Sequence, residues 1–221
     1  MRAAAAVFRR DLALAFRQGG GGAVALSFFL VTAATAPLAL GGARDVLGPI
    51  APGFIWTAAA LAALLSLERF FQSDYEEGGL EVLALSPAPL EIVAAAKAGA
   101  FWCAALLPLI AASPVIAVLL QMDAAAIAPL MVALLLGAPA LSLIGAAAAA
   151  LAVGVRRGGL LIALMALPLY APVLIFGAGA VNVAPEAGLA SAPMLFLAAY
   201  SLFCLAACPV AAGAALRLNL E

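Results

Sequence analysis

The sequence predicts an all-α integral membrane protein with six transmembrane helices. Of its 221 residues, 68% are hydrophobic and only 10% are charged, and the mean hydropathy is +1.23. Soluble domains contain roughly 45–50% apolar and 25% charged residues. Six stretches carry no charged residue, and each exceeds the ~20 residues that a helix needs to cross a bilayer core of about 30 Å. These stretches are 18–43, 46–67, 98–122, 124–155, 158–185 and 187–216.

The basic residues predict the orientation of this single transmembrane domain, residues 1–221. Six spans place both termini on one side of the membrane. That side then holds Arg2, Arg9, Arg10, Arg17, Arg69, Lys97, Arg156, Arg157 and Arg217, and the other side holds Arg44 alone. Positively charged loops remain preferentially in the cytoplasm. We therefore expect cytoplasmic N and C termini.

Residues 1–18 are predicted to form an amphipathic helix that lies in the membrane surface before the first span. Phe8, Leu12 and Phe16 recur every four residues and form one apolar stripe. Basic side chains on the adjoining arc suit anionic headgroups, so the expected membrane-surface anchors here are Arg9, Arg10 and Arg17. A cleavable signal peptide is the alternative, but its apolar region is usually shorter than the run that follows here.

The spans are expected at about 23–41, 49–67, 90–120, 126–153, 159–180 and 192–216. Between the fourth and fifth, Arg156 and Arg157 are expected either to anchor the chain at the headgroups or to contact a cytoplasmic partner. Lys97 lies a turn or two inside the third span. Its ammonium group can reach the headgroups along its flexible stem, or it can form a salt bridge with a carboxylate of the segment before this span.

That preceding segment, residues 68–90, is the polar part of an otherwise apolar chain. The stretch ERFFQSDYEEGGLEVLALSPAPLE, from Glu68 to Glu91, contains six of the eleven carboxylates. Gly78-Gly79 separates a charged piece from an apolar one, and Ser86-Pro87 ends the latter. We call residues 68–90 the coupling segment and predict two short elements that dock a water-soluble partner. The expected docking residues are Phe70, Phe71, Asp74, Tyr75, Glu76, Glu77 and Glu81. The alternative is a solvated acidic loop whose aromatic rings lie among headgroups.

Two prolines four residues apart characterise the fifth span. Pro168 and Pro172 remove backbone hydrogen bonds and are expected to bend this helix, with Tyr170 between them as a polar group. The functional interpretation is a kinked gate beside a transport path. The structural interpretation is a kink of the kind that is common in membrane helices.

The residues that are missing exclude several classes of function. The chain has no histidine, and its cysteines, Cys103, Cys204 and Cys208, all lie in predicted spans, so we expect no metal site and no haem attachment site. No P-loop sequence is present, and no catalytic constellation indicates an enzyme. The charge-free stretches lack the ionisable relays of proton- or sodium-coupled carriers. A net charge of −1 gives no indication of nucleic-acid binding. If a substrate crosses the membrane here, the energy is expected to come from a separate partner.

Four stretches together resemble a known family. They are RDLALAFRQGG near the start, LERFFQSDYEEGGLEVLALSPAPLEIVAAAK, GAPALSLIGAAAAAL and LPLYAPVLIFG. As a set they closely resemble the cytochrome c maturation B subunit, or haem exporter protein B, family. The resemblance implies an ABC-2-type exporter membrane domain in the bacterial cell inner membrane. It also implies as partners an ATP-binding-cassette ATPase subunit, other cytochrome c maturation membrane subunits and a periplasmic haem chaperone.

By this resemblance haem is the cargo, ATP is used by the partner subunit, and no cofactor is bound stably by this chain. The chain would export haem to the periplasmic face or drive the release of a haem-loaded chaperone there. An alternative is an exporter subunit for another amphiphile, such as a lipid or a glycan. A second alternative is a membrane scaffold that tethers an ATPase without transporting anything.

Overall fold

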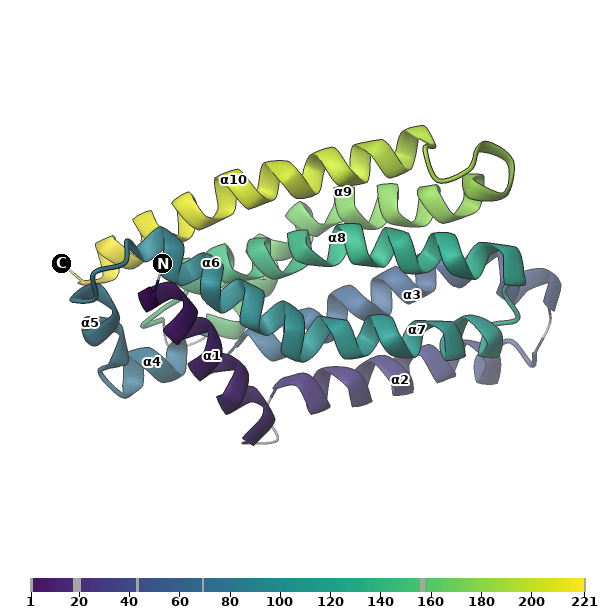
Figure 1. Cartoon of the computed structure of the whole chain (residues 1–221). Helices are drawn as coiled ribbons and strands as arrows, with labels where there is room; N and C mark the ends of the chain where they lie inside the picture. The colour runs from purple at the N-terminus through teal and green to yellow at the C-terminus, as the bar shows by residue number, and fades with distance from the viewer. Residues whose placement is uncertain (1, 18–20, 43, 69, 156–157, 221) are drawn as a thin grey trace.

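The structure is an elongated bundle of helices, seen from the side in Figure 1. This computed structural model describes residues 2–17, 21–42, 44–68, 70–155 and 158–220. Within those residues, every regular element is helical, and six helices are long and apolar enough to cross a membrane. The prediction of an all-α protein with six spans is therefore confirmed.

The spanning helices follow the charge-free stretches, with different boundaries at some ends. They are α2 (Gly21–Ala39), α3 (Arg44–Leu67), the continuous unit α6 (Leu90–Phe101), η1 (Trp102–Leu106) and α7 (Leu107–Leu119), then α8 (Ala124–Leu151), α9 (Gly158–Ala187) and α10 (Ala192–Leu220). Helix α3 begins five residues before the predicted start of its span, and α9 continues seven residues past its predicted end. Three shorter helices complete the fold: α1 (Arg2–Arg17), α4 (Gln72–Glu76) and α5 (Gly79–Ala84).

Helix α8 is the core of the bundle and packs against α9, α10, α6 and α3. Small residues explain the close packing, because Ser142, Ala146 and Ala150 follow one another at every fourth position and are almost completely buried. Without a hydrophobic driving force between helices in lipid, close approach of backbones and polar bonds between helices hold a membrane bundle together. The alanine-rich sequence of α8 is therefore what allows four neighbours to pack around it.

Hydroxyl groups connect the helices at four places. Each donates a hydrogen bond to a backbone carbonyl oxygen of a neighbouring helix. The bonds are Ser142 Oγ to Ala98 O (2.6 Å), Tyr170 Oη to Leu141 O (2.8 Å), Ser201 Oγ to Leu136 O (2.6 Å) and Tyr200 Oη to Leu169 O (2.9 Å). Such bonds contribute about 0.6 kcal/mol on average in membranes. Three of the four involve α8, so they reinforce the same core.

Trp56 of α3 fills a notch between α8 and α9. Its side chain is completely buried. A Cβ atom at Gly177 would lie 2.3 Å from Trp56 Cε2, and one at Gly137 would lie 2.6 Å from Trp56 Cη2. No side chain larger than hydrogen fits at either position without moving the indole ring. The two glycines thus allow a large aromatic side chain into the centre of the bundle.

Proline residues do not end these helices. Helix α9 continues through Pro168, Pro172 and Pro185 without interruption. In the third span, Pro108 follows a short π-helical segment, η1, whose wider turn was not predicted. Such segments interrupt the regular hydrogen-bond ladder and occur frequently where a helix has a functional role. The third span therefore has an internal irregularity near the middle of its length.

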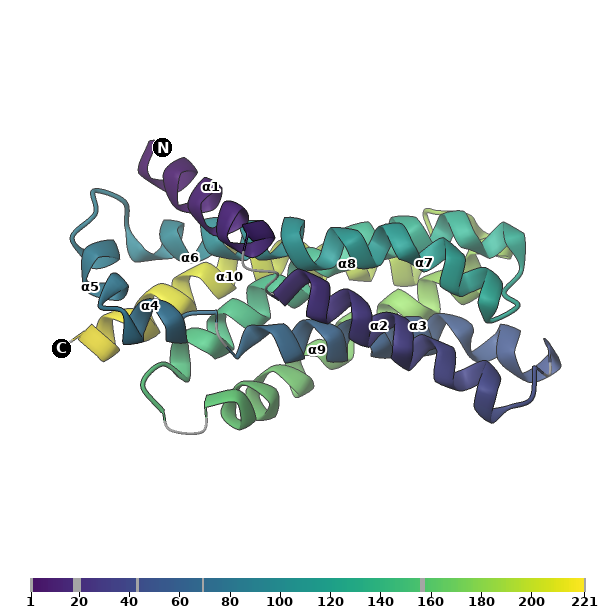
Figure 2. The ribbon, with the colours of Figure 1, turned by 90° about the horizontal axis from the view of Figure 1, so that it is seen from below.

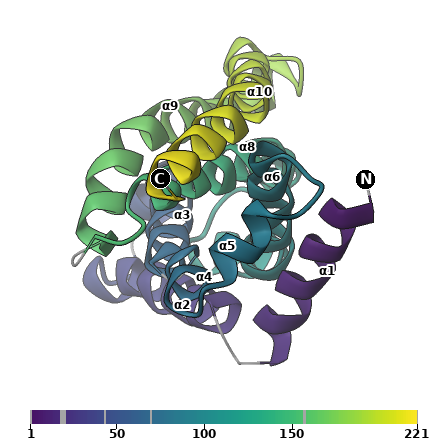
Figure 3. The ribbon, with the colours of Figure 1, turned by 90° about the vertical axis from the view of Figure 1, so that its left-hand side faces the viewer.

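The three short helices, α1, α4 and α5, gather at one end of the bundle, which we call the charged end. Figure 3 views this end directly and shows α4 and α5 lying across it. Helix α1 crosses α6 obliquely at the same end, as Figure 2 shows, and α10 ends there too. Both ends of the chain thus approach the coupling segment, as an even number of spans requires. That this end faces the cytoplasm stays a prediction from the positions of the arginines.

Replacing Gly177 with alanine is expected to destabilise the bundle by about 1–3 kcal/mol, because the added methyl group overpacks the Trp56 notch. The measurement is the free energy of unfolding in mixed micelles, followed by far-UV circular dichroism. Gly53→Ala is the matched control, since nothing lies within 4 Å of a Cβ atom at that position. Equal unfolding free energies for the two variants would contradict this account of the notch.

Candidate functional site

A cluster of four charged side chains joins three elements at the charged end of the bundle. Lys97 Nζ of α6 lies 2.5 Å from Asp11 Oδ2 of α1 and 2.7 Å from Asp74 Oδ2 of α4. Arg10 Nη2 lies 2.8 Å from Asp11 Oδ1 and 2.9 Å from Asp74 Oδ1. Each carboxylate therefore binds both cations. We call Arg10, Asp11, Asp74 and Lys97 the charge cluster.

Lys97 is the buried centre of the charge cluster. Its side chain is only 5% exposed, and its ammonium group also lies over the rings of Phe70 and Phe71, 5.6 and 5.4 Å from their centroids. The two rings meet edge to face. Of the two predicted alternatives for Lys97, the structure has the salt bridge with the coupling segment. Burial of a lysine is tolerated here because two carboxylates and two aromatic faces surround its charge.

Asp11 is a member of the charge cluster that the sequence alone did not reveal. It is the only acidic residue of α1, and it sits in the middle of a basic helix. That isolated carboxylate was the available signal, because a single acid among arginines suggests a specific partner. The partner itself lies 86 residues away in the chain, so no local pattern could identify it.

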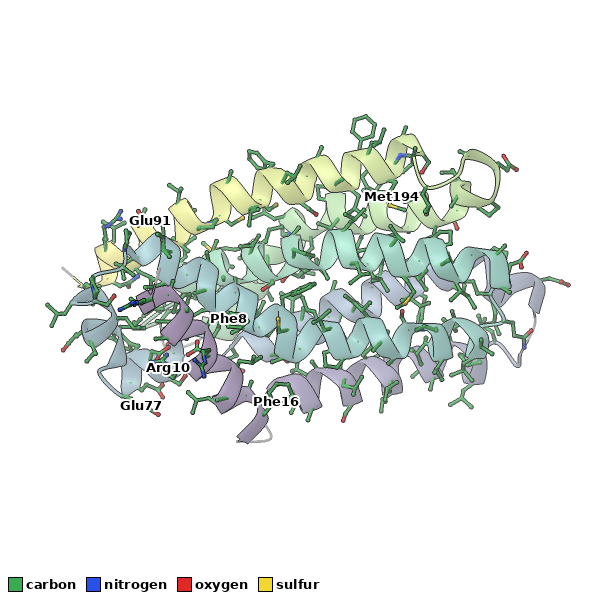
Figure 4. The ribbon with its side chains drawn as sticks, in the orientation of Figure 1. Phe8, Arg10, Phe16, Glu77, Glu91 and Met194 are labelled. Atoms are coloured by element: carbon green, nitrogen blue, oxygen red, sulfur yellow. The ribbon has the colours of Figure 1, made fainter. Side chains whose placement is uncertain are left out.

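The arginines predicted as membrane-surface anchors have different surroundings. Arg9 is exposed on α1, whereas Arg10 turns toward α4, as Figure 4 shows. Burial opposes the charge of Arg10, but hydrogen bonds and attraction from Asp11 and Asp74 outweigh burial and raise its pKa. Arg10 therefore acts within the charge cluster. The Arg17 side chain and both Arg156 and Arg157 lie outside the described residues.

Helix α1 rests partly on the bundle and partly beyond it. The ring of Phe8 lies against Gly99 of α6, where a Cβ atom would be 3.5 Å from the ring. Phe16, at the other end of the predicted apolar stripe, is 69% exposed. Figure 4 shows both side chains along α1. One end of the stripe therefore packs against the protein, and the other end is exposed and suits the membrane interface.

The residues predicted for docking divide into an inward set and an outward set. Phe71 is buried, and Asp74 is held in the charge cluster with 13% of its side chain exposed. Phe70 is half-buried between Phe71 and Phe101. The exposed set is Tyr75, Glu76, Glu77 and Glu81. The inward set attaches the coupling segment to the bundle, which leaves the outward set to meet a partner.

Two exposed apolar side chains of the coupling segment were not predicted to dock. Helix α5 buries Leu80 and Leu83 against the bundle. On its other side Val82 is 69% exposed and Leu85, directly after the helix, is 87% exposed. Apolar side chains next to exposed carboxylates form the kind of surface that a protein partner covers. A helix of six residues is too short for its sequence to show which face is buried.

A second ion pair holds the start of α6 to the end of α10. Glu91 pairs with Arg217, and a Cβ atom at Gly213 would lie 2.8 Å from Glu91 Cγ. Gly213 therefore provides the space in which the Glu91 side chain lies along α10. Asn219 donates a further hydrogen bond from Nδ2 to Ala150 O, at 3.3 Å, near the end of α8. Helix α6 is thus fixed by ion pairs at two points, Glu91 and Lys97.

The three gate candidates of α9 occupy unlike positions. Tyr170 is buried and donates its hydroxyl hydrogen bond to Leu141 O of α8, so it fastens α9 to the core. Pro168 is exposed on the outside of the bundle, and Pro172 is half-buried. The gate assignment stays a prediction. Among the described residues, no group of three or more Asp, Glu, Cys or His side chains could hold a metal ion.

Comparison with known proteins identifies relatives over nearly the whole chain. The family model described as CcmB protein matches residues 2–219. A protein named "Heme exporter protein B" from Paracoccus denitrificans is 48% identical over 216 residues, which cover 98% of this chain and 99% of the relative. The protein of the same name from Rhodobacter capsulatus is 47% identical, over 98% of this chain and 99% of the relative. The one from Escherichia coli K12 is 40% identical, over 97% of this chain and 98% of the relative.

Asp74→Asn is expected to lower the free energy of unfolding by about 1–3 kcal/mol, because Lys97 and Arg10 would each lose one charged partner. Glu77→Gln is the control, since the exposed Glu77 lies in the same segment and surface changes cost within about 0.5 kcal/mol. Both can be measured by denaturant unfolding in micelles. If Asp74→Asn were as stable as Glu77→Gln, the charge cluster would not hold the coupling segment.

Proposed function

The chain belongs to the CcmB protein family, and we propose that it is the transmembrane permease subunit of a haem exporter in c-type cytochrome biogenesis. One observation carries this proposal. Relatives named "Heme exporter protein B" are 40–48% identical to the chain over almost the full length of both proteins. All six spans and the coupling segment lie inside that match. The chain is therefore related as a whole, not through one shared helix pair.

The proposal requires a separate ATPase subunit, because the sequence has no P-loop of its own. The coupling segment supplies a suitable docking surface. Exposed Glu76, Glu77 and Glu81 would attract basic groups, and exposed Val82 and Leu85 would enter an apolar depression. Apolar anchors contribute most of the affinity of such interfaces, and complementary charge sets the partner and the register. Tyr75, which is 46% exposed, belongs to the same surface.

The arginine distribution favours a cytoplasmic position for this surface, where ATP is available. The membrane is then the bacterial cell inner membrane, with the opposite end of the bundle at the periplasmic face. Other cytochrome c maturation subunits and a periplasmic haem chaperone would meet the chain in or beyond the membrane. The subunit would either export haem to that face or drive the release of the haem-loaded chaperone there.

Stable haem ligation by this chain is disfavoured by its side chains. The sequence offers no imidazole, and the remaining candidate ligands are methionine, tyrosine and cysteine. Tyr170 and Cys204 are buried, and the Tyr170 hydroxyl is bound to α8. We therefore place axial ligation of the haem iron on a partner subunit. Contacts made by this chain would be transient and apolar, with α9 and its prolines Pro168 and Pro172 beside the path.

Reversing charge on the outward set is expected to abolish ATPase coupling. Glu76→Lys combined with Glu81→Lys should reduce co-purification with the P-loop subunit at least tenfold and reduce c-type cytochromes to the level of a gene deletion. Glu186→Lys is the control, because this exposed carboxylate lies at the opposite end of the bundle, near the end of α9.

Normal coupling in the double variant would refute docking at this surface. A deletion strain that still makes c-type cytochromes would instead favour an exporter of another amphiphile. ATPase binding to the chain without any ATP-dependent maturation would favour a scaffold.

Haem titrated into the purified chain is expected to give a weak, non-saturating change in the Soret band, without the spectrum of an axially ligated haem. Absorption spectroscopy in micelles measures this, with a histidine-ligated haem protein as the positive control. Saturable binding at a ratio of one haem per chain, with a thiolate or phenolate spectrum, would contradict the proposal that partners ligate the iron.

A further inference from the structure

Helix α4 cannot hold its own position. It has five residues, and isolated helices shorter than about 12–15 residues are marginal in water. Gln72 and Tyr75 of α4 lie against Gly154, which follows α8. The side chains that face inward are those of Phe71, which precedes α4, and Asp74 within it. Both contact Lys97, one through its ring and the other through its carboxylate. The orientation of α4 therefore depends mainly on what Lys97 contacts.

Lys97 also determines whether α1 and α4 can lie side by side. Asp11 of α1 and Asp74 of α4 both point into the charge cluster and would repel each other without a cation between them. Arg10 can bridge the two carboxylates as well, but its side chain is 40% exposed, so water screens its charge. The buried ammonium group of Lys97 is the stronger link because little water reaches it.

Helix α6 is suited to carry a displacement from this point into the membrane. Its twelve residues form a regular helix that is tied to α10 at Glu91 and to α1 and α4 at Lys97. Directly after it, the π-helical segment Trp102–Leu106 and Pro108 weaken the backbone ladder. A rigid helix that is followed by a weaker segment bends at the junction when its other end is moved.

We propose that Lys97 is a positioning residue that makes α1, α4 and the cytoplasmic part of α6 move as one unit, bending at η1. This inference rests on the proposed function, because it assigns Lys97 the transmission of ATP-driven movement from the coupling segment to the spans. Lys97 does not touch the ATPase or the cargo in this role. It acts by holding Asp74, Phe70 and Phe71 in place.

The test is a distance measurement in the full-length chain alone, in lipid nanodiscs, by pulsed electron paramagnetic resonance. Spin labels at Ala13→Cys in α1 and Glu77→Cys after α4 report the arrangement of the charged end, after Cys103, Cys204 and Cys208 are replaced by alanine. Labels at Ala124→Cys and Ala187→Cys report the opposite end. Lys97→Met is expected to widen the 13–77 distance distribution at least twofold and to leave the 124–187 distribution unchanged.

Lys97→Arg is the matched variant, because it keeps the charge and should retain the narrow 13–77 distribution. Asp74→Asn removes one of the two carboxylates that bind Lys97 and should also widen the 13–77 distance distribution. This variant tests the proposal if Lys97→Met does not accumulate. Widening at both label pairs, or at neither, would overturn the proposal.

In cells, Lys97→Met should lower c-type cytochrome content at least tenfold, and Lys97→Arg should restore most of it. Unimpaired maturation in Lys97→Met would overturn the transmission role. The two proposals fail separately. If no ATPase binds the wild-type chain, the proposed function fails, whereas the distance measurement needs no ATPase and tests Lys97 alone.

Discussion

A lysine that is buried at the edge of an apolar bundle must be neutralised, and this requirement organises the charged end of the protein. Lys97 binds one carboxylate from α1 and one from α4, and Arg10 joins the same two elements from the more exposed side. Their approach brings Phe70 and Phe71 over the ammonium group and closes the cluster. A buried ion pair adds little net stability against a well-packed apolar alternative, but it fixes which groups face each other. A segment that docks a partner needs such a fixed arrangement of its side chains.

The membrane part of the molecule follows a different principle. Lipid offers no hydrophobic effect to drive helices together, so their backbones must approach closely and share hydrogen bonds. Alanine and glycine on α8 permit the approach, and hydroxyl groups on α9 and α10 supply bonds to its carbonyl oxygens. The notch for Trp56 is an example of such close approach, since two glycines on different helices accommodate one indole ring. In our proposal the charged end moves against this core.

The two parts together fit a subunit that converts movement and leaves the chemistry to partners. The chain has neither a P-loop nor a histidine, so in our proposal ATP and haem iron are both handled elsewhere. Its own contribution is a surface of carboxylates and apolar side chains on α4 and α5, and a helix, α6, that leads from that surface into the bilayer. The π-helical interruption in the third span directly follows that helix.

The sequence alone determined the number of spans and the place of the polar segment between the second and third spans. Apolar length and charge are local properties, and they decide which segments enter the hydrocarbon core of a bilayer. Glycine at position 78, where φ is 70°, likewise marks the boundary between α4 and α5. Tertiary structure alone decided that Phe71 and Asp74 face inward, that Asp11 joins them, and that Val82 and Leu85 face outward. These outcomes depend on pairs far apart in the chain, and short helices carry too few residues for periodicity to reveal a buried face. Composition sets which solvent each segment prefers, but the partner of a buried charge is chosen only when the helices pack.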